Sequence, residues 1–381
     1  MPTTSTVTGN TEPTAAAVVA RIDLGALVHN LAVARRHAPH SRVMGVVKSL
    51  AYGHGMLPVA RTLVRAGCDA LAVARMEEAL ALRQAGIEAP LVVLEGCIWA
   101  AELEPARRHD LQLVLHDVHQ LEMLRADRGR EPVRCWLKFD TGMHRLGFDP
   151  AEAQPLLAQC EALSQVRLEG LMTHLANADD TNDPATPRQL ARMAEVAALA
   201  DLPCSIANSA GILAWPESHA DWVRPGLMLY GASPLLGRSA AELGLRPVMT
   251  LQAPLIAIHG IHAGDPVGYG GTWRAPEDLP LGVVGIGYGD GYPREIAPGT
   301  EVLLRGRRVP VVGRVSMDMI CVDLRGVPEP RVGDRVVLWG EGLPAEELAE
   351  KADTIPYTLF CGVTERAARI YREQGGGRRA G

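Results

Sequence analysis

Residues 43–74 read VMGVVKSLAYGHGMLPVARTLVRAGCDALAVA. The apolar run Val43–Val47 is followed by a helix-patterned stretch, Leu57–Ala66, and then by a second apolar run, Ala70–Ala74. Short apolar runs bounded by turn residues indicate buried strands, and strands that alternate with helical patterns are typical of a parallel sheet. This stretch therefore predicts one strand–helix–strand unit.

The same alternation continues to about residue 230. Further strand-like runs are Leu91–Leu94, Gln112–Leu115, Val133–Phe139, Val166–Thr173, Cys204–Ala207 and Trp222–Leu229. Further helix-patterned stretches are Met76–Ala85, Val118–Arg125 and Pro187–Ala200. Eight strands alternating with helices describe a (β/α)8 barrel of the TIM type, although a doubly wound open sheet also alternates. The count favours the barrel, which is an α/β fold.

The pattern changes near Leu245, where glycine, proline and valine become frequent and turns separate short apolar strands. We expect a disordered N-terminal extension over residues 1–17, the barrel over 18–246, a C-terminal mostly-β domain over 247–373 and a flexible tail over 374–381. One helix is expected around Pro344–Lys351. The strand-like run Val18–Asp23 precedes the barrel and is a candidate to pair with the β domain.

Composition narrows the class of protein. The chain has 381 residues, 47% of them hydrophobic, and a net charge of −6, which fits an acidic protein with a substantial core. No dense basic cluster points to nucleic acid, and no long apolar run points to a secretion signal or a membrane. Seven dispersed cysteines without a CxxC pair favour a reducing compartment, so we expect a cytoplasmic protein and no metal site.

Polar and basic residues follow the predicted strands. In barrels of this kind the working residues lie at the carboxyl ends of the strands. Polar strand ends can simply reflect contact with solvent, but the number of basic groups in this set favours a site for a small anionic ligand. The set is Lys48, His116, Lys138 to Arg145, His174, Asn208, Ser209 and Arg224.

Lys48 is the most informative of these residues, because it ends an apolar strand and precedes Gly53 and Gly55. Apolar surroundings disfavour a charged ammonium, and a neutral lysine can form a Schiff base. The two glycines permit a close backbone turn beside it. A single lysine after a strand is usually only a solvated charge, so further evidence is needed.

The run Val46-Val47-Lys48-Ser49-Leu50-Ala51-Tyr52-Gly53-His54-Gly55 resembles the pyridoxal-phosphate site of the alanine racemase family. Residues 138–147, KFDTGMHRLG, are similar to the family's second block. The remaining matching blocks follow in family order: Thr173-His174, Asn208-Ser209, Arg224-Pro225-Gly226, Val267–Gly270, Gly287–Tyr292, Gly313–Asp318 and Ile355-Pro356-Tyr357. The resemblance covers about residues 18–373 and implies an enzyme that interconverts L-alanine and D-alanine, in the supply or consumption of D-alanine for peptidoglycan.

The resemblance implies pyridoxal 5'-phosphate as the cofactor and two catalytic bases. Lys48 would bind the cofactor as an imine and exchange a proton on one face of the substrate Cα, and Tyr269 would serve the other face. The resemblance also implies a homodimer in which each site joins one subunit's barrel to its partner's β domain.

The other residues take their roles from the same resemblance. Tyr52, Ser209, Gly226 and Tyr357 match the phosphate contacts, and Asn208 belongs to the cofactor set. Arg224 would face the pyridine nitrogen and leave it unprotonated, because a guanidinium keeps its proton, and His174 would orient Arg224. The substrate set is Arg145, Met317 and Asp318. The residues expected at the narrow access to the site are Tyr288, Arg294, Arg314 and Asp179.

Lys138 matches a lysine that is often carbamylated in the family. An unmodified ammonium there would lie beside the guanidinium of Arg145, which costs free energy. A carbamate would replace that repulsion with an attraction, so the resemblance implies a modified Lys138.

Three residues depart from the family pattern and leave substrate breadth and access geometry open: Leu50 stands where Asn or Asp is expected, Asn177 where a smaller residue is common, and Thr358 where an acidic residue is expected. The nearest alternative is a broad-specificity or serine racemase of the same fold. A decarboxylase of the related barrel class is opposed by the Lys48 and Tyr269 motifs. A cofactor carrier without enzymatic activity would be expected to lack the β domain.

Overall fold

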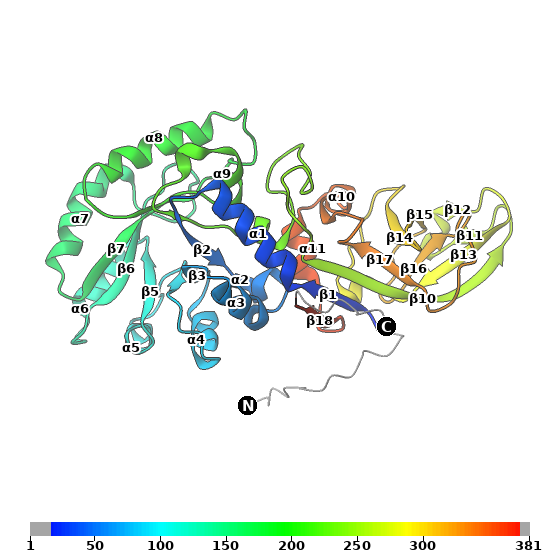
Figure 1. Cartoon of the computed structure of the whole chain (residues 1–381), viewed down its shortest axis with the longest axis horizontal. Coiled ribbons are helices and arrows are strands. Elements are labelled where there is room, and N and C mark those ends of the chain that lie inside the picture. The colour runs from blue at the N-terminus through cyan, green and yellow to red at the C-terminus, as the bar shows by residue number, and fades with distance from the viewer. Residues whose placement is uncertain (1–16, 374–381) are drawn as a thin grey trace, which may run out of the picture. The chain divides into compact units, whose positions relative to one another are not determined.

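The computed structural model describes residues 17–373, and its contacts divide the chain into two compact units (Figure 1). The barrel unit comprises Asp23–Val248 and the described residues from Tyr371 onward. The β unit comprises Met249–Ile370 and the described residues up to Ile22. The expected flexible tail and, apart from Ala17, the expected disordered extension lie outside the described residues.

The barrel unit contains a closed ring of parallel strands, β2 to β9, in sequence order. The ring closes where β9 pairs with β2, with Trp222 opposite Arg42 and Val223 opposite Val43. This closure confirms the TIM-type barrel and excludes the open sheet. The strands are β2 Arg42–Val46, β3 Ala70–Val73, β4 Leu91–Val93, β5 Leu111–Leu115, β6 Val133–Lys138, β7 Val166–Met172, β8 Cys204–Ser205 and β9 Trp222–Val223.

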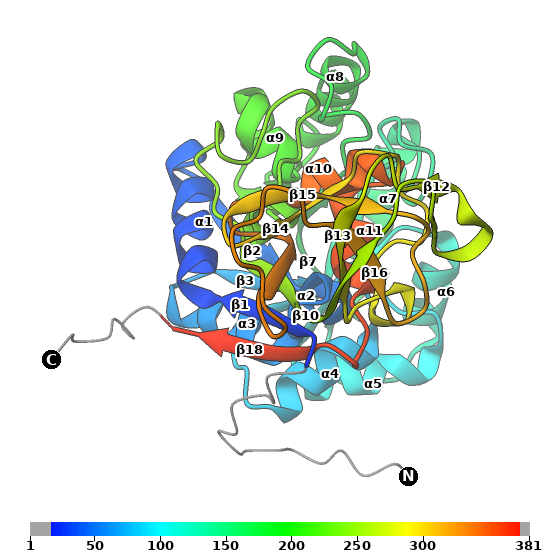
Figure 2. The same ribbon diagram turned by 90° about the vertical axis from the view of Figure 1, so that its right-hand side faces the viewer.

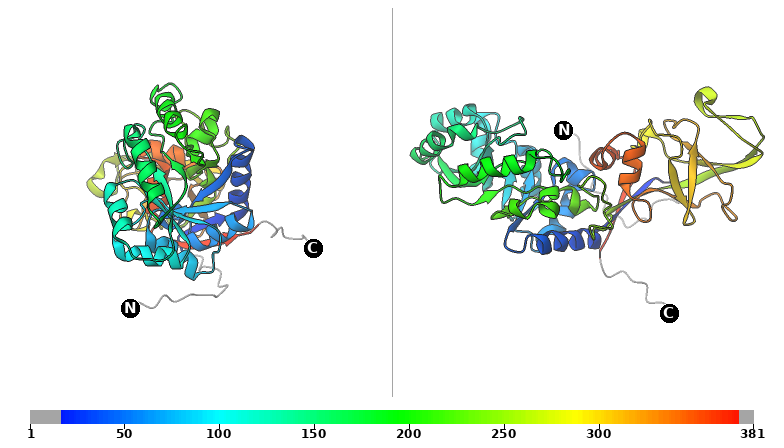
Figure 3. Two further views of the ribbon diagram at one scale, coloured as in Figure 1. Left: turned by 90° about the vertical axis from the view of Figure 1, so that its left-hand side faces the viewer. Right: turned by 90° about the horizontal axis from the view of Figure 1, so that it is seen from above.

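Helices surround this ring, as the left-hand view of Figure 3 shows. The first helix, α1 (Leu24–His37), was not predicted from the sequence. Asp23 caps it by accepting a hydrogen bond from the backbone N–H of Ala26 at 2.9 Å. The other α-helices are α3 Met56–Arg65, α4 Met76–Gln84, α5 Leu103–Arg108, α6 Val118–Ala126, α7 Ala153–Ala162, α8 Ala185–Ala197 and α9 Ser209–Ala214, and the short element labelled α2, Lys48–Tyr52, has left-handed backbone within it. The 3₁₀ turns are η1 Ala100–Glu102, η2 Pro150–Glu152, η3 Pro216–Ser218 and η4 Leu227–Tyr230.

The last predicted barrel strand, Trp222–Leu229, was too long. Strand β9 ends at Val223, and the chain then forms the buried turn η4. Pro225 has no N–H to donate to a strand ladder. Leu227, Met228 and Leu229 are buried, so their apolar run is typical of a strand although its backbone is a 3₁₀ turn.

The β unit contains an eight-stranded sheet in the order β13-β16-β15-β14-β17-β10-β1-β18. Figure 2 shows β18 beside β1 in this sheet. Strand β1 (Val19–Asp23) pairs antiparallel with β10 (Met249–Ile261), with Val19 opposite Gln252. The other strands of this sheet are β13 Leu279–Val284, β14 Glu301–Leu304, β15 Arg307–Val312, β16 Ile320–Asp323, β17 Arg335–Trp339 and β18 Ala368–Arg372. A buried cluster packs on it that includes Val267, Leu279, Leu281 and Val312.

Short elements complete the β unit. A two-stranded ribbon pairs β11 (Pro266–Val267) with β12 (Trp273–Arg274). The turns η5 (Tyr269–Gly271) and η6 (Tyr288–Asp290) lie between strands, and two helices follow β17: α10 (Ala345–Lys351) and α11 (Pro356–Gly362). Within residues 17–373, no helix has the length and apolar character needed to cross a membrane.

Candidate active site

Lys48 begins an unusual turn directly after β2. The next four residues, Ser49, Leu50, Ala51 and Tyr52, all have φ between 50° and 55°, in the left-handed region. None is glycine, and this conformation costs roughly 1–2 kcal/mol for each such residue. Gly53 and Gly55, which were expected to permit a turn here, also have positive φ, at 75° and 95°, but four residues with side chains precede them in the left-handed region. Strained backbone that the surrounding structure maintains is common at functional sites.

Tyr52 is the end of this turn and lies inside the barrel unit. Its ring packs on Tyr230 with centroids 4.7 Å apart, and the hydroxyl of Tyr230 donates to the carbonyl of Val46 at 2.8 Å. A Cβ on Gly226 would lie 2.7 Å from the hydroxyl oxygen of Tyr52. A side chain at position 226 would therefore force this hydroxyl to move, because the backbone closely approaches it.

Ser209 adds a second hydroxyl beside Gly226. Its Oγ accepts hydrogen bonds from the backbone N–H of Gly226 at 2.9 Å and of Met228 at 3.3 Å. A hydroxyl that accepts twice keeps its own proton for donation to an acceptor. Asn208 caps α9 by accepting from the N–H of Gly211 at 3.0 Å, and its amide donates to the carbonyl of Leu175 at 3.3 Å.

Arg224 is a buried cation with three oxygen partners. Nη1 donates to Oγ of Ser205 at 2.7 Å, and Nη2 donates to the carbonyls of Thr173 at 2.6 Å and Ile206 at 3.3 Å. Burial lowers the pKa of Arg224 to about 10, so the guanidinium remains charged at neutral pH. A buried guanidinium bound only by neutral groups leaves its positive charge without compensation, which favours an anion nearby.

His174 lies against this guanidinium, with Nδ1 at 3.4 Å from Nη2 of Arg224. Burial first, and then the charges of Arg224, Lys138 and Arg145, hold the pKa of His174 well below 6.5. His174 is therefore neutral at neutral pH.

Lys138 ends β6 and is buried. Burial, followed by the positive charges of Arg224 and Arg145, lowers its pKa from 10.5 to about 8, although Asp140 opposes the change and Lys48 adds to it. Lys48, Lys138, Arg145 and Arg224 thus form a cluster of basic groups close enough to affect one another. The structure brings these predicted residues together on one rim of the barrel.

The carboxylate of Asp140 holds the loop that carries Arg145. It accepts backbone N–H bonds from Gly142, Met143 and His144 at 2.9–3.0 Å and from Arg145 at 3.1 Å. Burial disfavours the charged form of Asp140, but these bonds from the backbone outweigh it and lower its pKa. The loop thus has a fixed, ionised carboxylate at its centre.

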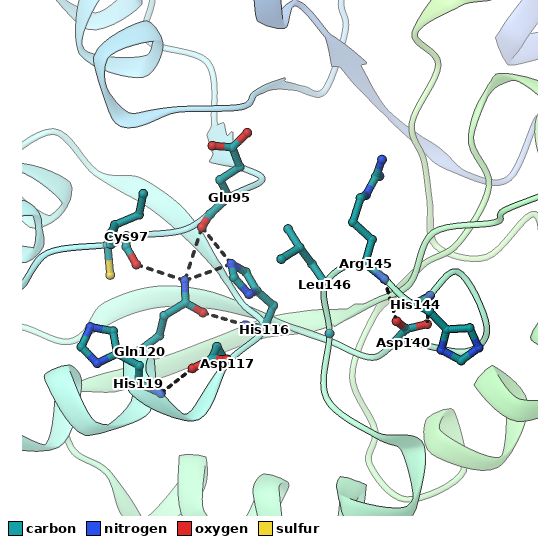
Figure 4. A pocket seen from close by; sticks show the side chains of 12 residues that line it. Glu95, Cys97, His116, Asp117, His119, Gln120, Asp140, His144, Arg145 and Leu146 are labelled. Carbon is teal, nitrogen blue, oxygen red and sulfur yellow. Dashed lines mark hydrogen bonds between the residues drawn. The ribbon is translucent and has the colours of Figure 1, made fainter.

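Figure 4 shows the side chain of Arg145 leading away from Asp140, beside a cavity of about 330 Å³. Glu95, His116 and Asp117 line the opposite part of this cavity. Nε2 of His116 lies 3.0 Å from the carbonyl oxygen of Glu95.

The remaining predicted residues, apart from Asp179, belong to the β unit. Tyr269 and Met317 are exposed, at 72% and 53% of their surface. Tyr269 stands between Gly268 and Gly270, whose φ values are 71° and 74°. Asp318 accepts a 2.7 Å hydrogen bond from Arg366.

The predicted access residues and Tyr357 are more scattered. The backbone N–H of Tyr288 donates to Ser316, Arg294 pairs with Glu295 at 2.9 Å, and Tyr357 lies on α11. A Cβ on Gly270 would lie 3.3 Å from Nη1 of Arg314. Asp179, in the barrel unit, accepts from the N–H of Leu236 through its backbone carbonyl at 3.1 Å.

The residues of the barrel rim fit pyridoxal 5'-phosphate. The basic cluster suits a phosphate and a carboxylate, and a phosphate can accept from the hydroxyls of Tyr52 and Ser209. Gly226 has no side chain, so its backbone lies directly beside the hydroxyls of Tyr52 and Ser209. Lys48, at the end of β2, carries the amine that would form the Schiff base.

Comparison with known proteins agrees with these features over most of the chain. The family described as "Alanine racemase, N-terminal domain" matches residues 22–234, and "Alanine racemase, C-terminal domain" matches residues 248–371. This chain belongs to the alanine racemase family. The family and the enzyme class inferred from the sequence are thereby confirmed.

Individual relatives cover nearly the whole chain. A Nitrosococcus oceani protein named alanine racemase is 53% identical over 351 residues, which cover 91% of this chain and 97% of that protein. An Escherichia coli protein named biosynthetic alanine racemase is 48% identical over 354 residues, covering 92% of this chain and 98% of that protein.

Solved structures of this family agree with the fold. Biosynthetic alanine racemase from Pseudomonas aeruginosa has a TM-score of 0.90 and 45% identity, covering 94% of this chain and 99% of that one. Alanine racemase from Bartonella henselae has a TM-score of 0.86 and 32% identity, covering 94% and 100%, and it carries covalently bound pyridoxal phosphate.

Several polar residues connect the segments of the barrel rim by hydrogen bonds, and their roles were not predicted from the sequence. Asp140 lies in a motif quoted for the resemblance, and an Asp followed two residues later by Gly is itself a turn signal. Thr141 and Thr173 are buried at the ends of β6 and β7, and Gln189 is buried on α8. A glutamine on a helix carries no sequence signal for such a role, because the contact depends on packing between distant segments.

Proposed function

We propose that this chain is an alanine racemase that uses pyridoxal 5'-phosphate and interconverts L-alanine and D-alanine. The observation that carries the proposal is the basic cluster on the barrel rim. In it, the pKa of the buried Lys138 is lowered to about 8 by burial and by Arg224, Arg145 and Lys48. A cofactor phosphate and a substrate carboxylate would place negative charge beside Lys48, Arg145 and Arg224.

When bound, the cofactor supplies a ring that accepts the electron pair left on the substrate Cα after loss of its proton. Lys48 would hold the cofactor and exchange that proton on one face of Cα. Tyr269 would exchange it on the other face, because inversion requires one base on each side. Arg145 would orient the substrate carboxylate, with Met317 and Asp318 beside it.

Arg224 and His174 would set the charge at the pyridine nitrogen. The guanidinium of Arg224 has only donors and keeps its proton, so a ring nitrogen facing it would remain unprotonated. His174, neutral beside Arg224, would hold the guanidinium in place. The hydroxyls of Tyr52, Ser209 and Tyr357, with the backbone at Asn208 and Gly226, would bind the phosphate.

The proposal includes a homodimer with shared sites, in which Tyr269 of the partner subunit serves each barrel. Tyr269, Met317 and Tyr288 are 72%, 53% and 40% exposed. Exposed aromatic and thioether side chains suit a surface that another chain covers. The cytoplasmic setting and the role in D-alanine metabolism are part of the same proposal, supported by the resemblance to the biosynthetic Escherichia coli protein.

Reductive trapping tests the proposal well, because the chain has only three lysines, at positions 48, 138 and 351. The purified protein incubated with the cofactor and borohydride should carry the pyridoxyl group on Lys48, as read by peptide mass spectrometry. Lys48→Ala should lose the label and lower racemisation of alanine by about 10³-fold or more. The matched control is Lys351→Ala, at the exposed end of α10, which should keep both.

The result that overturns the proposal is a wild-type protein that neither takes up the label nor racemises alanine. Labelling of Lys48 together with faster racemisation of serine than of alanine would favour the broad-specificity alternative instead.

A further inference from the structure

Three buried polar side chains form a hydrogen-bonded chain from α8 to the end of β6. Nε2 of Gln189 donates to Oγ1 of Thr141 at 3.2 Å, and the hydroxyls of Thr141 and Thr173 lie 2.8 Å apart. Oγ1 of Thr173 donates to the carbonyl of Phe139 at 2.9 Å. At most 1% of the surface of each of the three side chains is exposed.

The direction of every bond in this chain is fixed. The carbonyl of Phe139 can only accept, so the single hydroxyl proton of Thr173 points to it. Thr173 must then accept from Thr141, whose proton is thereby used as well. Thr141 must accept in turn from the amide of Gln189, which is a donor. Each hydroxyl donates once and accepts once, so removing the hydroxyl of Thr141 takes an acceptor from Gln189 and a donor from Thr173.

Gln189 also joins this chain to the end of β7. Its Nε2 donates to the carbonyl of His174 at 3.0 Å, and its Oε1 accepts from the backbone N–H of Ala176 at 2.8 Å. Arg192, one turn further along α8, donates to the carbonyl of Thr141 at 3.1 Å. One helix therefore fixes the ends of two neighbouring barrel strands.

Both threonines of the chain lead to residues of the proposed site. The carbonyl of Thr173 accepts the 2.6 Å bond from Arg224, whose Nη2 lies beside His174. Thr141 directly follows Asp140, the carboxylate that holds the backbone N–H of Arg145. A shift of Thr141 would therefore move the loop that carries Arg145, and a shift of Thr173 would move the support of Arg224.

We propose that Thr141 is a positioning residue of this site, whose hydroxyl fixes the Arg145 loop and, through Thr173, the support of Arg224. This inference rests on the proposed function for its effect on catalysis, but its effect on the loop can be measured without substrate or cofactor. Thr141 itself need not contact either one.

Thr141→Val and Thr141→Ser form the test pair. Valine keeps the shape of threonine and removes the hydroxyl, so one buried N–H of Gln189 loses its acceptor and Oγ1 of Thr173 loses the bond that it accepts. Serine keeps the hydroxyl and loses only a methyl group. The matched control is Thr250→Val in the β unit, where a buried hydroxyl accepts a single bond from the N–H of Glu341 at 3.2 Å.

The first measurement is hydrogen–deuterium exchange of the cofactor-free protein, read on a peptide containing the amides of residues 142–145. These amides donate to Asp140, so their protection reports the order of the loop. Thr141→Val should raise their exchange rate about tenfold or more, the effect expected when a buried hydrogen-bonding group loses its partner. Thr141→Ser and Thr250→Val should leave the rate within about threefold of wild type.

The second measurement separates kcat from KM for alanine in both directions, together with the dissociation constant of pyridoxal 5'-phosphate. Thr141→Val should lower kcat/KM by about 10- to 100-fold, because small misplacement of binding groups is costly. Thr141→Ser and Thr250→Val should remain within about threefold of wild type. A general loss of stability would instead affect Thr141→Val and Thr250→Val alike.

Two results overturn the inference: unchanged exchange at residues 142–145 in Thr141→Val, or a loss of kcat/KM no greater than that of Thr250→Val. If Thr141→Val does not fold, Gln189→Met removes the first donor of the chain and should give the same accelerated exchange. An inactive wild-type protein would overturn the proposed function, while the exchange experiment would still decide the role of Thr141 in the loop.

Discussion

Nη2 of Arg224 lies 3.4 Å from Nδ1 of His174. A guanidinium has only donors, so Nδ1 must accept this bond and cannot carry a proton. The proton of the neutral imidazole is therefore on Nε2. This contact fixes both the charge and the tautomer of His174, and a second proton on the ring would place two cations in contact.

The first prediction concerns the stability of the cofactor-free protein between about pH 7 and pH 5. The folded pKa of His174 lies well below 6.5, while the unfolded chain has the ordinary value near 6.5. As the pH falls below 6.5, His174 binds a proton in the unfolded state but not in the folded state. The stability conferred by neutral His174 is therefore lost. His174→Gln should reduce the fall in the free energy of unfolding by up to about 1.4 kcal/mol per pH unit.

Urea unfolding at a series of pH values measures this difference between wild type and His174→Gln. Parallel curves for the two proteins over that range would contradict the assignment of a neutral His174.

The second prediction is that Lys138 carries a carbamate. Its pKa of about 8 leaves an appreciable fraction of neutral amine at neutral pH, and only the neutral amine reacts with carbon dioxide. The product is an anion and would replace the repulsion from Arg224 and Arg145 by attraction. With ¹³C-labelled bicarbonate near pH 8, the wild-type protein should show a carbamate signal in its ¹³C NMR spectrum.

Lys138→Gln should lack this signal, and Lys351→Ala should keep it. Lowering the pH well below 8 should remove it, because the amine is then protonated. A wild-type spectrum without the signal at saturating bicarbonate would rule out the modification.

The third prediction concerns Leu50, which departs from the family pattern. Leu50 occupies a position where Asn or Asp is expected, and its φ of 54° is in the left-handed region, which Asn and Asp adopt more readily than leucine. Its side chain is 60% exposed, so little packing would be lost. Leu50→Asn should stabilise the protein by about 0.5–1 kcal/mol, raising Tm by about 1–3 °C.

Leu236→Asn is the matched control for Leu50→Asn. Leu236 is 66% exposed and lies outside the left-handed region. Scanning calorimetry should show no rise in Tm for this variant. An equal rise in both variants would mean that exposed leucine, rather than backbone conformation, is the cause.

The fourth prediction concerns the shared site. Lys48→Ala and Tyr269→Phe should each be inactive, but mixing them under conditions of subunit exchange should restore activity. Random exchange makes half of the dimers mixed, each with one intact and one doubly altered site, so roughly a quarter of all sites should recover. The assay is racemisation after exchange, with exchange itself followed by mass spectrometry of isotopically labelled subunits.

If exchange is complete and the mixture remains inactive, each site is formed within one chain. The shared-site dimer would then be wrong.

The barrel could be predicted from the sequence because its strands are buried on both faces and therefore appear as continuous apolar runs. The same signal failed after Val223, because η4 is also buried and apolar. Burial determines which residues are apolar but leaves backbone geometry open. Pro225, whose ring removes a ladder donor, and Gly226 after it were the local signs that the strand had ended.

By itself the sequence determined the fold class, the family and the residue types at the ends of the barrel strands. These follow from apolar periodicity and from the order of the motifs, which are both local features of the sequence. Tertiary structure alone decided the left-handed turn after Lys48, the low pKa of Lys138 and the chain from Gln189 through Thr141 to Thr173. Each depends on contacts between segments far apart in sequence: 48 residues separate Thr141 from Gln189. Burial and the approach of like charges arise only when such segments pack, so no local pattern encodes them.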